Sequence, residues 1–394
     1  MTGTDPRHAA PAAVARPPAR SGNAPGGTAR ETTTRSVKAP AVHDPFRRPS
    51  TDPTLGQGLQ APTTPAWAPT PTLTDRSSLD APGLVVGEVL IDTHEHEDGR
   101  SEHLSGAGAN VAIGLARLGR PVELVTSFGA DSHGVTARAL LERENVQVAP
   151  GSDRASRTST VQVQPGQDTG ASPADLVWEP PNARLTRYPL VVHVGSLGAV
   201  LEPGSRTVAG IIAAYRPGAT ITYDPALHPE IIDSPEDARS LVEGLLARAD
   251  LVKVCTRDLS WLYPGEDHKA VARRWLTSGP GIVVIDMGAE GAWAVNSVGE
   301  VATASGHGFG VADTAGAGDA FMAALIDALW NGGLLGVAAR EDLHTLRQGS
   351  LQALIDHATT AAAITASRPR GNPPTRAELD AGHGIPQVTA RPGQ

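Results

Sequence analysis

The 394-residue chain contains a single cysteine, so it can form no internal disulfide framework, and a reducing compartment such as the cytoplasm is the simplest expectation. It has no apolar run close to the roughly 20 residues of a membrane-spanning helix, and we therefore predict no membrane partner. It has only three lysines and no GxxxxGK[ST] motif, which excludes a P-loop. What it does have is a hydrophobic content of 40%, which is typical of a soluble globular protein.

The first 80 residues differ in composition from the rest, because proline, threonine, alanine, arginine and serine dominate and apolar residues occur singly. They hold nine basic and six acidic residues, which leaves 33 − 9 = 24 basic and 42 − 6 = 36 acidic residues for the remainder. We predict that residues 1–80 form a disordered tail and that residues 81–394 form one folded domain. The arginine content leaves an organellar transit peptide as an alternative. The acidic remainder argues against nucleic acid as a partner.

Strand and helix patterns alternate from residue 84 onward. Strands that are apolar throughout, separated by amphipathic helices, predict a mostly parallel central sheet covered on both faces, which is a three-layer α/β/α sandwich. GLVVGEVLID (83–92) and DLVWE (175–179) are among the expected strands, and LQALIDHATTAAAITAS (351–367) is expected to be the last helix. Segments near 88–105 and 158–180 are too short and polar for a central sheet, and we expect them to form a small β lid.

The stretch VADTAGAGDAF (311–321) places small residues and Asp319 at the start of an apolar helix. The helical spacing of Phe321, Leu325 and Leu329 predicts a buried face there. The first amides of a helix have no internal partner, and small residues let a phosphate approach them closely. Asp319 would then accept a proton from an attacking hydroxyl group. A simpler alternative, an acid that only stabilises the helix dipole, stays open at this point.

Two longer motifs resemble the signatures of a known protein family. SGAGANVAIGLARLG (105–119) with FGADSHG (128–134) resembles the first signature of the ribokinase-like (PfkB) sugar kinases, and DTAGAGDAF (313–321) resembles the second. The resemblance covers about residues 84–386. It is greatest to the fructokinases, through VGEVLID, HVGSL, YDPALHP, ADLVKVCTRDLSWL and TASRPRGNPPTRAEL.

The resemblance implies that ATP donates its γ-phosphoryl group to a hydroxyl group of a small sugar, with fructose as the first candidate and with Mg²⁺ and K⁺ as cations. In it, Asp319 is the catalytic base, and the amides of Gly316, Ala317 and Gly318 form an anion hole. The implied sugar-binding residues are Asp92, Gly106 and Asn110, and the implied nucleotide-binding residues are Gly288, Gly291, Asn372 and Thr314. Asp313 would help to hold the monovalent cation, and Asp258 would organise magnesium indirectly.

Several residues depart from the family pattern. Ser105 replaces the first glycine of a pair, Cys255 and Asp258 stand at the N-x-x-E positions, and Asp286 replaces a usual threonine beside the nucleotide. His228 stands where fructokinases of the DPNxR type carry arginine. Other acceptors of the same fold therefore remain alternatives: a nucleoside, a keto-deoxy sugar acid or a sugar phosphate. A sugar-binding regulatory protein without turnover is a further alternative, and a lid strand could pair edge to edge in a homodimer.

Two other patterns have simpler interpretations. The histidines and acids of THEHEDGRSEH (93–103) lack a closed ligand set of recognisable spacing, so we interpret them as a solvated lid strand and not as a metal site. Trp261, Trp275 and Trp293 are interpreted as packing residues, and Cys255 as a small residue at a strand end.

Overall fold

The computed structural model describes residues 81–96, 99–163, 176–179, 187–229, 231–232, 234–306 and 311–382. The predicted tail, residues 1–80, lies outside the described residues, so its disorder stays a prediction. None of the helices in the described ranges is long and apolar enough to cross a membrane.

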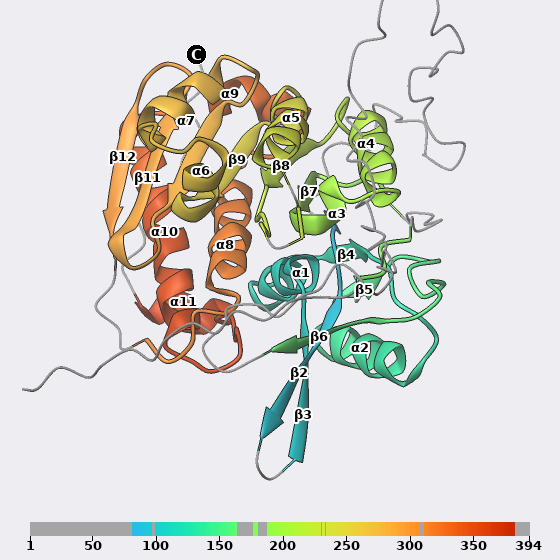
Figure 1. Cartoon of the computed structure of the whole chain (residues 1–394). Helices are drawn as coiled ribbons and strands as arrows, with labels where there is room; N and C mark the ends of the chain where they lie inside the picture. Colours follow the sequence, from blue (N-terminus) through green and yellow to red (C-terminus); the bar gives the residue numbers. More distant parts are fainter. Residues whose placement is uncertain are drawn as a thin grey trace, which may run out of the picture. The chain divides into compact units, whose positions relative to one another are not determined.

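The larger sheet contains nine strands in the order β12-β11-β10-β9-β8-β7-β1-β4-β5 within the described residues (Figure 1). Their bounds are β1 (Gly83–Val86), β4 (Val122–Val125), β5 (Gln147–Val148), β7 (Val191–Gly195), β8 (Thr220–Asp224), β9 (Leu251–Cys255), β10 (Ile282–Asp286), β11 (Gly291–Asn296) and β12 (Val301–Ser305). From β5 to β10 the neighbours are parallel, whereas β11 and β12 are antiparallel additions. The predicted mostly parallel sheet is confirmed.

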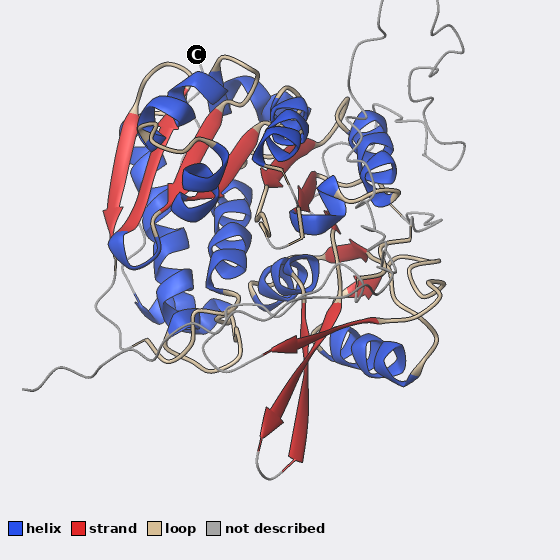
Figure 2. Cartoon of the chain, viewed as in Figure 1, coloured by secondary structure: helices blue, strands red, loops and turns tan. Residues whose placement is uncertain are grey.

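Helices flank this sheet (Figure 2). Their bounds are α1 (Ala107–Arg117), α2 (Ser132–Arg143), α3 (Ser196–Val200), α4 (Gly204–Tyr215), α5 (Pro235–Leu246), α6 (Thr256–Leu262), α7 (His268–Leu276), α8 (Ala317–Asn331), α9 (Arg340–His344), α10 (Gln348–Ala366) and α11 (Arg376–Gly382), with 3₁₀ turns η4 (Gly288–Glu290) and η5 (Val337–Ala339). One hydrophobic core joins α1, α8 and α10 to one set of strand residues, including Val85 and Val284. A second core joins α4, α5 and α7 to the alternate residues, including Val86 and Val283. Successive strand residues point to opposite faces, and both faces are buried, as three layers require.

The structure differs from the sequence prediction in local detail. GLVVGEVLID does not form one strand, because β1 ends at Val86 and the chain enters another sheet at β2 (Leu90–His96). The break follows from a close approach, since a Cβ on Gly87 would lie 2.9 Å from the Cα of Gly108. Residues 176–179 form no strand, and the Val177 amide instead donates to the Ser159 hydroxyl at 2.9 Å. The helix at 351–367 is not the last, because α11 follows it.

Helix α8 is buried more completely than its spacing predicted. Phe321, Leu325 and Leu329 are buried as expected, but so is every residue from Ala320 to Trp330. The helix lies between α1 and α10, which cover its two sides. A helix that is apolar nearly all round belongs in an interior, and this one forms the centre of its layer.

A second sheet of three strands, in the order β3-β2-β6, lies apart from the larger one (Figure 1). β2 pairs antiparallel with β3 (Gly99–Ser105) and parallel with β6 (Ser159–Val163). Asp92 stands opposite His103 across the β2–β3 pair. The strands of this sheet fall within the predicted lid segments 88–105 and 158–180, although residues 176–179 of the second segment form no strand, and its movement as a lid stays a prediction.

The two outer strands of the larger sheet differ in length. β5 has two residues, and β12 has five. The outward backbone groups of Thr303 in β12 are satisfied by one side chain from α10. The Thr303 amide donates to Gln352 Oε1 at 3.3 Å, and Gln352 Nε2 donates to the Thr303 carbonyl at 3.0 Å.

Candidate active site

Strand ends and the start of α8 converge at one edge of the larger sheet. The last residues of neighbouring parallel strands are in register, with Asp224 beside Gly195 and Asp286 beside Cys255. Helix α8 begins at the same edge, because a Cβ on Gly318 would lie 3.0 Å from Lys253 Nζ of β9 and 3.7 Å from Asp286 Oδ2. Ligands of open parallel sheets bind outside the carboxyl ends of the strands.

The turn before α8 requires glycine at its first position. Gly316 is the N-terminal cap of the helix in a left-handed conformation, with φ 69°. A Cβ there would also lie 3.0 Å from the Cα of Gly371. The Ala317 amide donates to the Thr314 carbonyl at 3.2 Å, so one of the three amides predicted for the anion hole has a partner within the turn. Gly318 lacks the side chain that would fill the space in front of Lys253.

Asp319 lies in the first turn of α8 and accepts a hydrogen bond from a residue that is distant in sequence. Asn110 Nδ2 of α1 donates to Asp319 Oδ2 at 2.8 Å. Burial raises the pKa of the Asp319 carboxyl group, while the Asn110 hydrogen bond and the nearby Lys253 oppose that rise. Glu88 adds to the rise, and His228 counters it. Two predicted residues, one from each signature, therefore meet at a carboxylate with a raised affinity for protons.

The glycine turn before α1 is fixed by backbone contacts with the end of β1. A Cβ on Gly106, whose φ is 102°, would lie 2.6 Å from the Glu88 carbonyl oxygen. The Ala109 amide donates to that carbonyl at 3.2 Å, and the Ala107 amide donates to Glu88 Oε1 at 3.1 Å. Glu88 thus caps α1 from outside, and it places Gly106 and Asn110 beside the start of α8.

Asp92 lies on β2 with a partner that the family pattern did not lead us to expect. Burial raises its pKa, and a hydrogen bond from the Ser105 hydroxyl together with nearby His94 opposes the rise. Ser105, which departs from the family glycine, therefore holds Asp92. The His94 and His103 rings lie 5.5 Å apart. Among the described residues no group of three or more His, Cys, Asp or Glu side chains is placed to hold a metal ion.

Lys253 is a buried cation among carboxylates. Its Nζ donates to Asp224 Oδ2 at 2.9 Å and lies 3.7 Å from Asp286 Oδ2, and its side chain is 5% exposed. Burial alone would lower the pKa of Lys253, but Asp224 and Asp286 raise it above its ordinary value, so the ammonium stays charged. Burial raises the pKa of Asp224 to about 7 in spite of this ion pair.

Cys255 and Asp258 lie at the junction of β9 and α6. The Asp258 amide donates to Cys255 Sγ at 3.4 Å, and Asp258 Oδ2 accepts the Leu227 amide at 3.1 Å. Burial raises the pKa of the Cys255 thiol to about 12, which leaves it protonated and unsuited to act as a nucleophile. Burial also raises the pKa of Asp258. Its Oδ1 is buried and has no hydrogen-bond partner in the described part of the chain.

The residues predicted for the nucleotide fall in two places. Gly288 and Gly291 bound η4, both with positive φ, and the Gly288 amide donates to Asp286 Oδ1 at 2.9 Å. Asp286 therefore turns one oxygen toward this turn and the other toward Lys253. Thr314 is exposed in the turn before Gly316. Asn372 follows Gly371, whose Cα would lie 3.0 Å from a Cβ built on Gly316, and its Oδ1 accepts a hydrogen bond from Arg117 Nη1 at the end of α1.

Asp313 joins the turn before α8 to the loop after α10. Its Oδ1 accepts the Ala315 amide, and its Oδ2 accepts the Arg370 amide, both at 2.9 Å. The Ala312 amide donates to the Ala366 carbonyl at 2.8 Å. Through these bonds the loop that contains Gly371 lies against Gly316.

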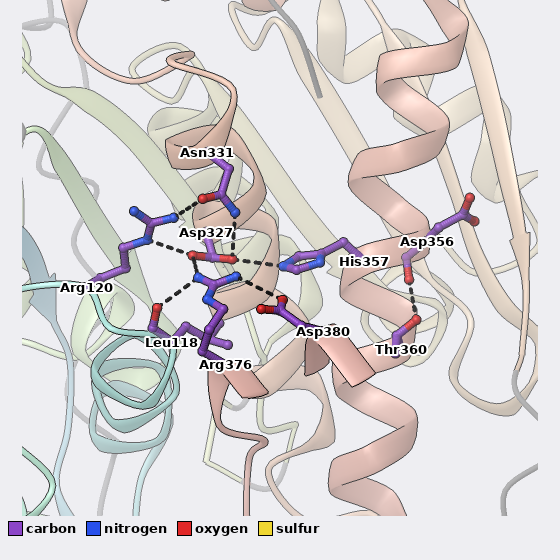
Figure 3. Close-up of polar contacts among 9 residues, drawn as sticks. All are labelled: Leu118, Arg120, Asp327, Asn331, Asp356, His357, Thr360, Arg376 and Asp380. Atoms are coloured by element: carbon purple, nitrogen blue, oxygen red, sulfur yellow. Dashed lines mark hydrogen bonds and ion pairs between the residues drawn. The ribbon is translucent and has the colours of Figure 1, made fainter. Parts of the chain in front are cut away.

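A buried ionic network anchors the middle of α8 (Figure 3). Asp327, with a fully buried side chain, accepts hydrogen bonds from Arg120 Nε at 2.7 Å and from Arg376 of α11, and its Oδ2 lies 2.9 Å from His357 Nε2 of α10. Arg376 also donates to the Leu118 carbonyl at 2.8 Å. Burial opposes ionisation of Asp327, but these partners lower its pKa to about 2. The network fixes α11, and with it the end of the loop beside Asp313.

Comparison with known proteins identifies the family. A family model described as pfkB family carbohydrate kinase matches residues 83–377. The chain belongs to the pfkB family of carbohydrate kinases. A fructokinase of Klebsiella pneumoniae is 31% identical over 263 residues, which is 62% of this chain and 83% of the relative. One from Rhizobium leguminosarum bv. trifolii is 30% identical over 258 residues, which is 62% of this chain and 79% of the relative.

The fold of this kinase is also that of a solved fructokinase. A double mutant of the fructokinase from Vibrio cholerae O395, in a form with fructose, ADP and potassium ion bound, superposes with a TM-score of 0.62 at 22% identity. The match covers 77% of this chain and 98% of that one.

Sequence reasoning missed two residues of this kinase's candidate site. Lys253 is a lone charge inside the buried strand LVKVC, and it is one of only three lysines, so its rarity was a usable signal. Glu88 lies two residues after the end of β1 and is 7% exposed, but nothing in the sequence indicates that it caps a helix starting at residue 107. Trp275 and Trp293 are buried packing residues, as predicted.

Proposed function

We propose that this kinase transfers the γ-phosphoryl group of ATP to a hydroxyl group of fructose. The observation that carries the proposal is the Asp319 carboxylate in the first turn of α8, held by Asn110 at 2.8 Å. Two fructokinases at about 30% identity support the choice of acceptor. The raised pKa of Asp319 suits a general base, because a more basic carboxylate takes a proton more readily.

In this proposal Asp319 accepts the proton of the attacking hydroxyl group as the oxygen–phosphorus bond forms. The bond between the γ-phosphorus and the oxygen of ADP breaks in the same step. The amides of Gly316, Ala317 and Gly318 stabilise the transferring group, with the Ala317 amide exchanging its carbonyl partner for the anion.

Asp92, Gly106 and Asn110 bind the sugar. The small sheet closes over it and excludes water, which limits hydrolysis of ATP. Asp92 is suited to this because Ser105 holds its carboxylate in place. Asn110 would contact the sugar while keeping its hydrogen bond to Asp319, which couples the presence of substrate to the position of the base.

Gly288, Gly291, Thr314 and Asn372 form the nucleotide side of the site. Magnesium would neutralise the phosphate oxygens and would be held mostly by them and by water. The buried Oδ1 of Asp258 accepts no hydrogen bond from the described residues and lies 3.9 Å from Arg257 Nε, and it fits the role of orienting such a water. Potassium, bound in the Vibrio cholerae structure, would fit beside the Asp313 carboxylate, which already joins two loops.

Assembly and location are also proposed. β3 is an outer strand of the small sheet and could pair with a second copy in a homodimer. The single cysteine favours the cytoplasm as the compartment.

The test is coupled ATP turnover with a panel of acceptors and identification of the product by mass. The panel contains fructose, other hexoses, ribose, a nucleoside, a keto-deoxy sugar acid and a sugar phosphate. We expect fructose phosphate, and we expect Asp319→Asn to lower kcat by about 10²- to 10⁴-fold. Asp356→Asn, a partly exposed acid of α10, is the matched control and should retain turnover.

Three results would contradict different parts of this proposal. Undiminished turnover in Asp319→Asn rejects the assigned base. Preference for another member of the panel rejects fructose. Calorimetric binding of fructose without any phosphorylated product favours a sugar-binding regulatory protein.

A further inference from the structure

The position of Lys253 is unusual for a lysine. Its ammonium group lies at the first turn of α8, as the 3.0 Å between Nζ and a Cβ built on Gly318 shows. The N-terminus of a helix carries a partial positive charge and repels a cation. Burying a charged lysine there is unfavourable unless anions surround it, and the residue that could have screened it, at position 318, has no side chain. The geometry is that of a site prepared for an additional anion.

The described residues use only part of the hydrogen-bonding capacity of the Lys253 ammonium group. Asp224 Oδ2 accepts one hydrogen bond at 2.9 Å, whereas Asp286 Oδ2 is 3.7 Å away, beyond hydrogen-bond distance. The other oxygen of Asp286, Oδ1, accepts a hydrogen bond from the Gly288 amide. An ammonium group has three donors, and the described residues accept one of them. A Cβ built on Gly318 would lie 3.0 Å from Nζ, so the first turn of α8 is within reach of the other donors.

We propose that Lys253 is a further catalytic residue, whose ammonium group contacts the phosphoryl group during its transfer. This inference rests on the proposed phosphoryl transfer. As the sugar oxygen bonds to phosphorus, its proton passes to Asp319 and the bond to ADP breaks. Negative charge is then spread over the three outer phosphoryl oxygens. Lys253 and the α8 amides stabilise that charge from one side, and Lys253 keeps its proton throughout.

The proposal also explains two small features of the sequence. Gly318 must lack a side chain because Lys253 occupies the adjacent space as well as because a phosphate approaches. Asp286, which departs from the family threonine, is acceptable beside a nucleotide because Lys253 lies between the two. A compact ammonium on a flexible stem reaches this position, whereas the planar guanidinium of arginine would need a wider space.

The test compares Lys253→Met with wild type in steady-state turnover and in binding. Removing a donor from a transferring anion lowers kcat by about 10²- to 10³-fold, and we expect this loss across the whole pH range. We also expect ADP with aluminium fluoride and fructose, a mimic of the transferring group, to bind at least about 10²-fold more weakly by calorimetry. Binding of ADP alone should change by less than about threefold. Lys269→Met, at an exposed lysine of α7, is the matched control and should behave as wild type.

A folding defect is separated by a second pair of variants. Lys253→Met leaves Asp224 buried without a partner, so Lys253→Met with Asp224→Asn restores a neutral pair and its thermal stability, while kcat stays low. Asp224→Asn alone shows what loss of that carboxylate does.

The inference is overturned if kcat stays within fivefold of wild type, or if ADP and the aluminium fluoride complex weaken equally. It is also overturned if turnover recovers at high pH, because Lys253 would then act only by ionising Asp319. These outcomes leave the proposed function intact, since failure of that function appears as a wild-type enzyme that phosphorylates no sugar.

Discussion

Replacing Asp327 by asparagine tests the ionic network in the middle of α8. The carboxyl group ordinarily has a pKa of 3.8, and its partners lower it to about 2 in the folded state. At about 1.4 kcal/mol per pKa unit, this difference is worth about 2 kcal/mol at neutral pH. Arg120, Arg376 and His357 lose the charge of their partner as well; the two arginines remain partly exposed, which limits the added cost, whereas His357 is buried. We therefore expect the free energy of unfolding to fall by about 2–3 kcal/mol.

The pH dependence has a definite sign. A depressed pKa stabilises the fold fully above the unfolded value near 4, and the stabilisation is lost as the pH falls from about 4 to about 2. Urea unfolding of wild type and Asp327→Asn between pH 8 and pH 3.5 should show a constant difference down to about pH 5, with the decline starting only below it.

Asp356→Asn provides the control, because Asp356 lies one residue before His357 on the same helix (Figure 3). Its carboxylate is partly exposed and accepts a bond from Gln352 at 2.8 Å, so we expect a change below about 0.5 kcal/mol. The reasoning fails if Asp327→Asn costs no more than this control. It also fails if the difference disappears between pH 5 and 7, since the carboxylate is ionised throughout that range.

Three further predictions concern the candidate site. The acid limb of kcat in a pH–rate profile should lie above the ordinary aspartate pKa of 3.8, because Asp319 must be ionised and its pKa is raised. Asn110→Leu removes a hydrogen bond that opposes this rise and should move the limb to higher pH, while an unmoved limb would contradict the assignment. Gly316→Ala should lower stability by about 1–2 kcal/mol and reduce turnover, whereas Gly333→Ala, also left-handed but with open space around it, should lower stability alone. Arg117→Ala releases Asn372 and should raise the KM for ATP several-fold; an unchanged KM in initial-rate assays would argue against Asn372 as a nucleotide contact.

The sequence was sufficient for the architecture because strand and helix periods are local properties. The alternation of apolar strands with amphipathic helices predicted the parallel part of the large sheet from the residues alone. Local patterns could not place GLVVGEVLID, because the strand ends where Gly87 meets Gly108, a residue more than twenty positions away. The same limit applies to α8, whose complete burial depends on α1 and α10.

The candidate site likewise contains residues that the sequence predicted and contacts that it could not predict. Asp319 and Asn110 were found because each lies in a recognisable motif, and the structure brings them to 2.8 Å. Their pairing, the capping of α1 by Glu88, and the cluster of Lys253 with Asp224 and Asp286 depend on how strand ends meet. Ser105 stood out in the sequence only as a departure from the family glycine, and in the structure its hydroxyl group donates to Asp92. The effect of a residue that departs from a family pattern can therefore be judged only once the residues around it in the fold are known.

The interaction of Gln352 with β12 bears on how copies of this chain can associate. An unpaired outer strand invites another strand to extend the sheet, which is a common route to uncontrolled aggregation. Here the Gln352 side chain bonds both the amide and the carbonyl of Thr303, the two groups that an added strand would need at that residue. The opposite margin, β5, offers only two residues. With Thr303 blocked at one margin and only a two-residue strand at the other, the described part of the large sheet disfavours edge-to-edge growth.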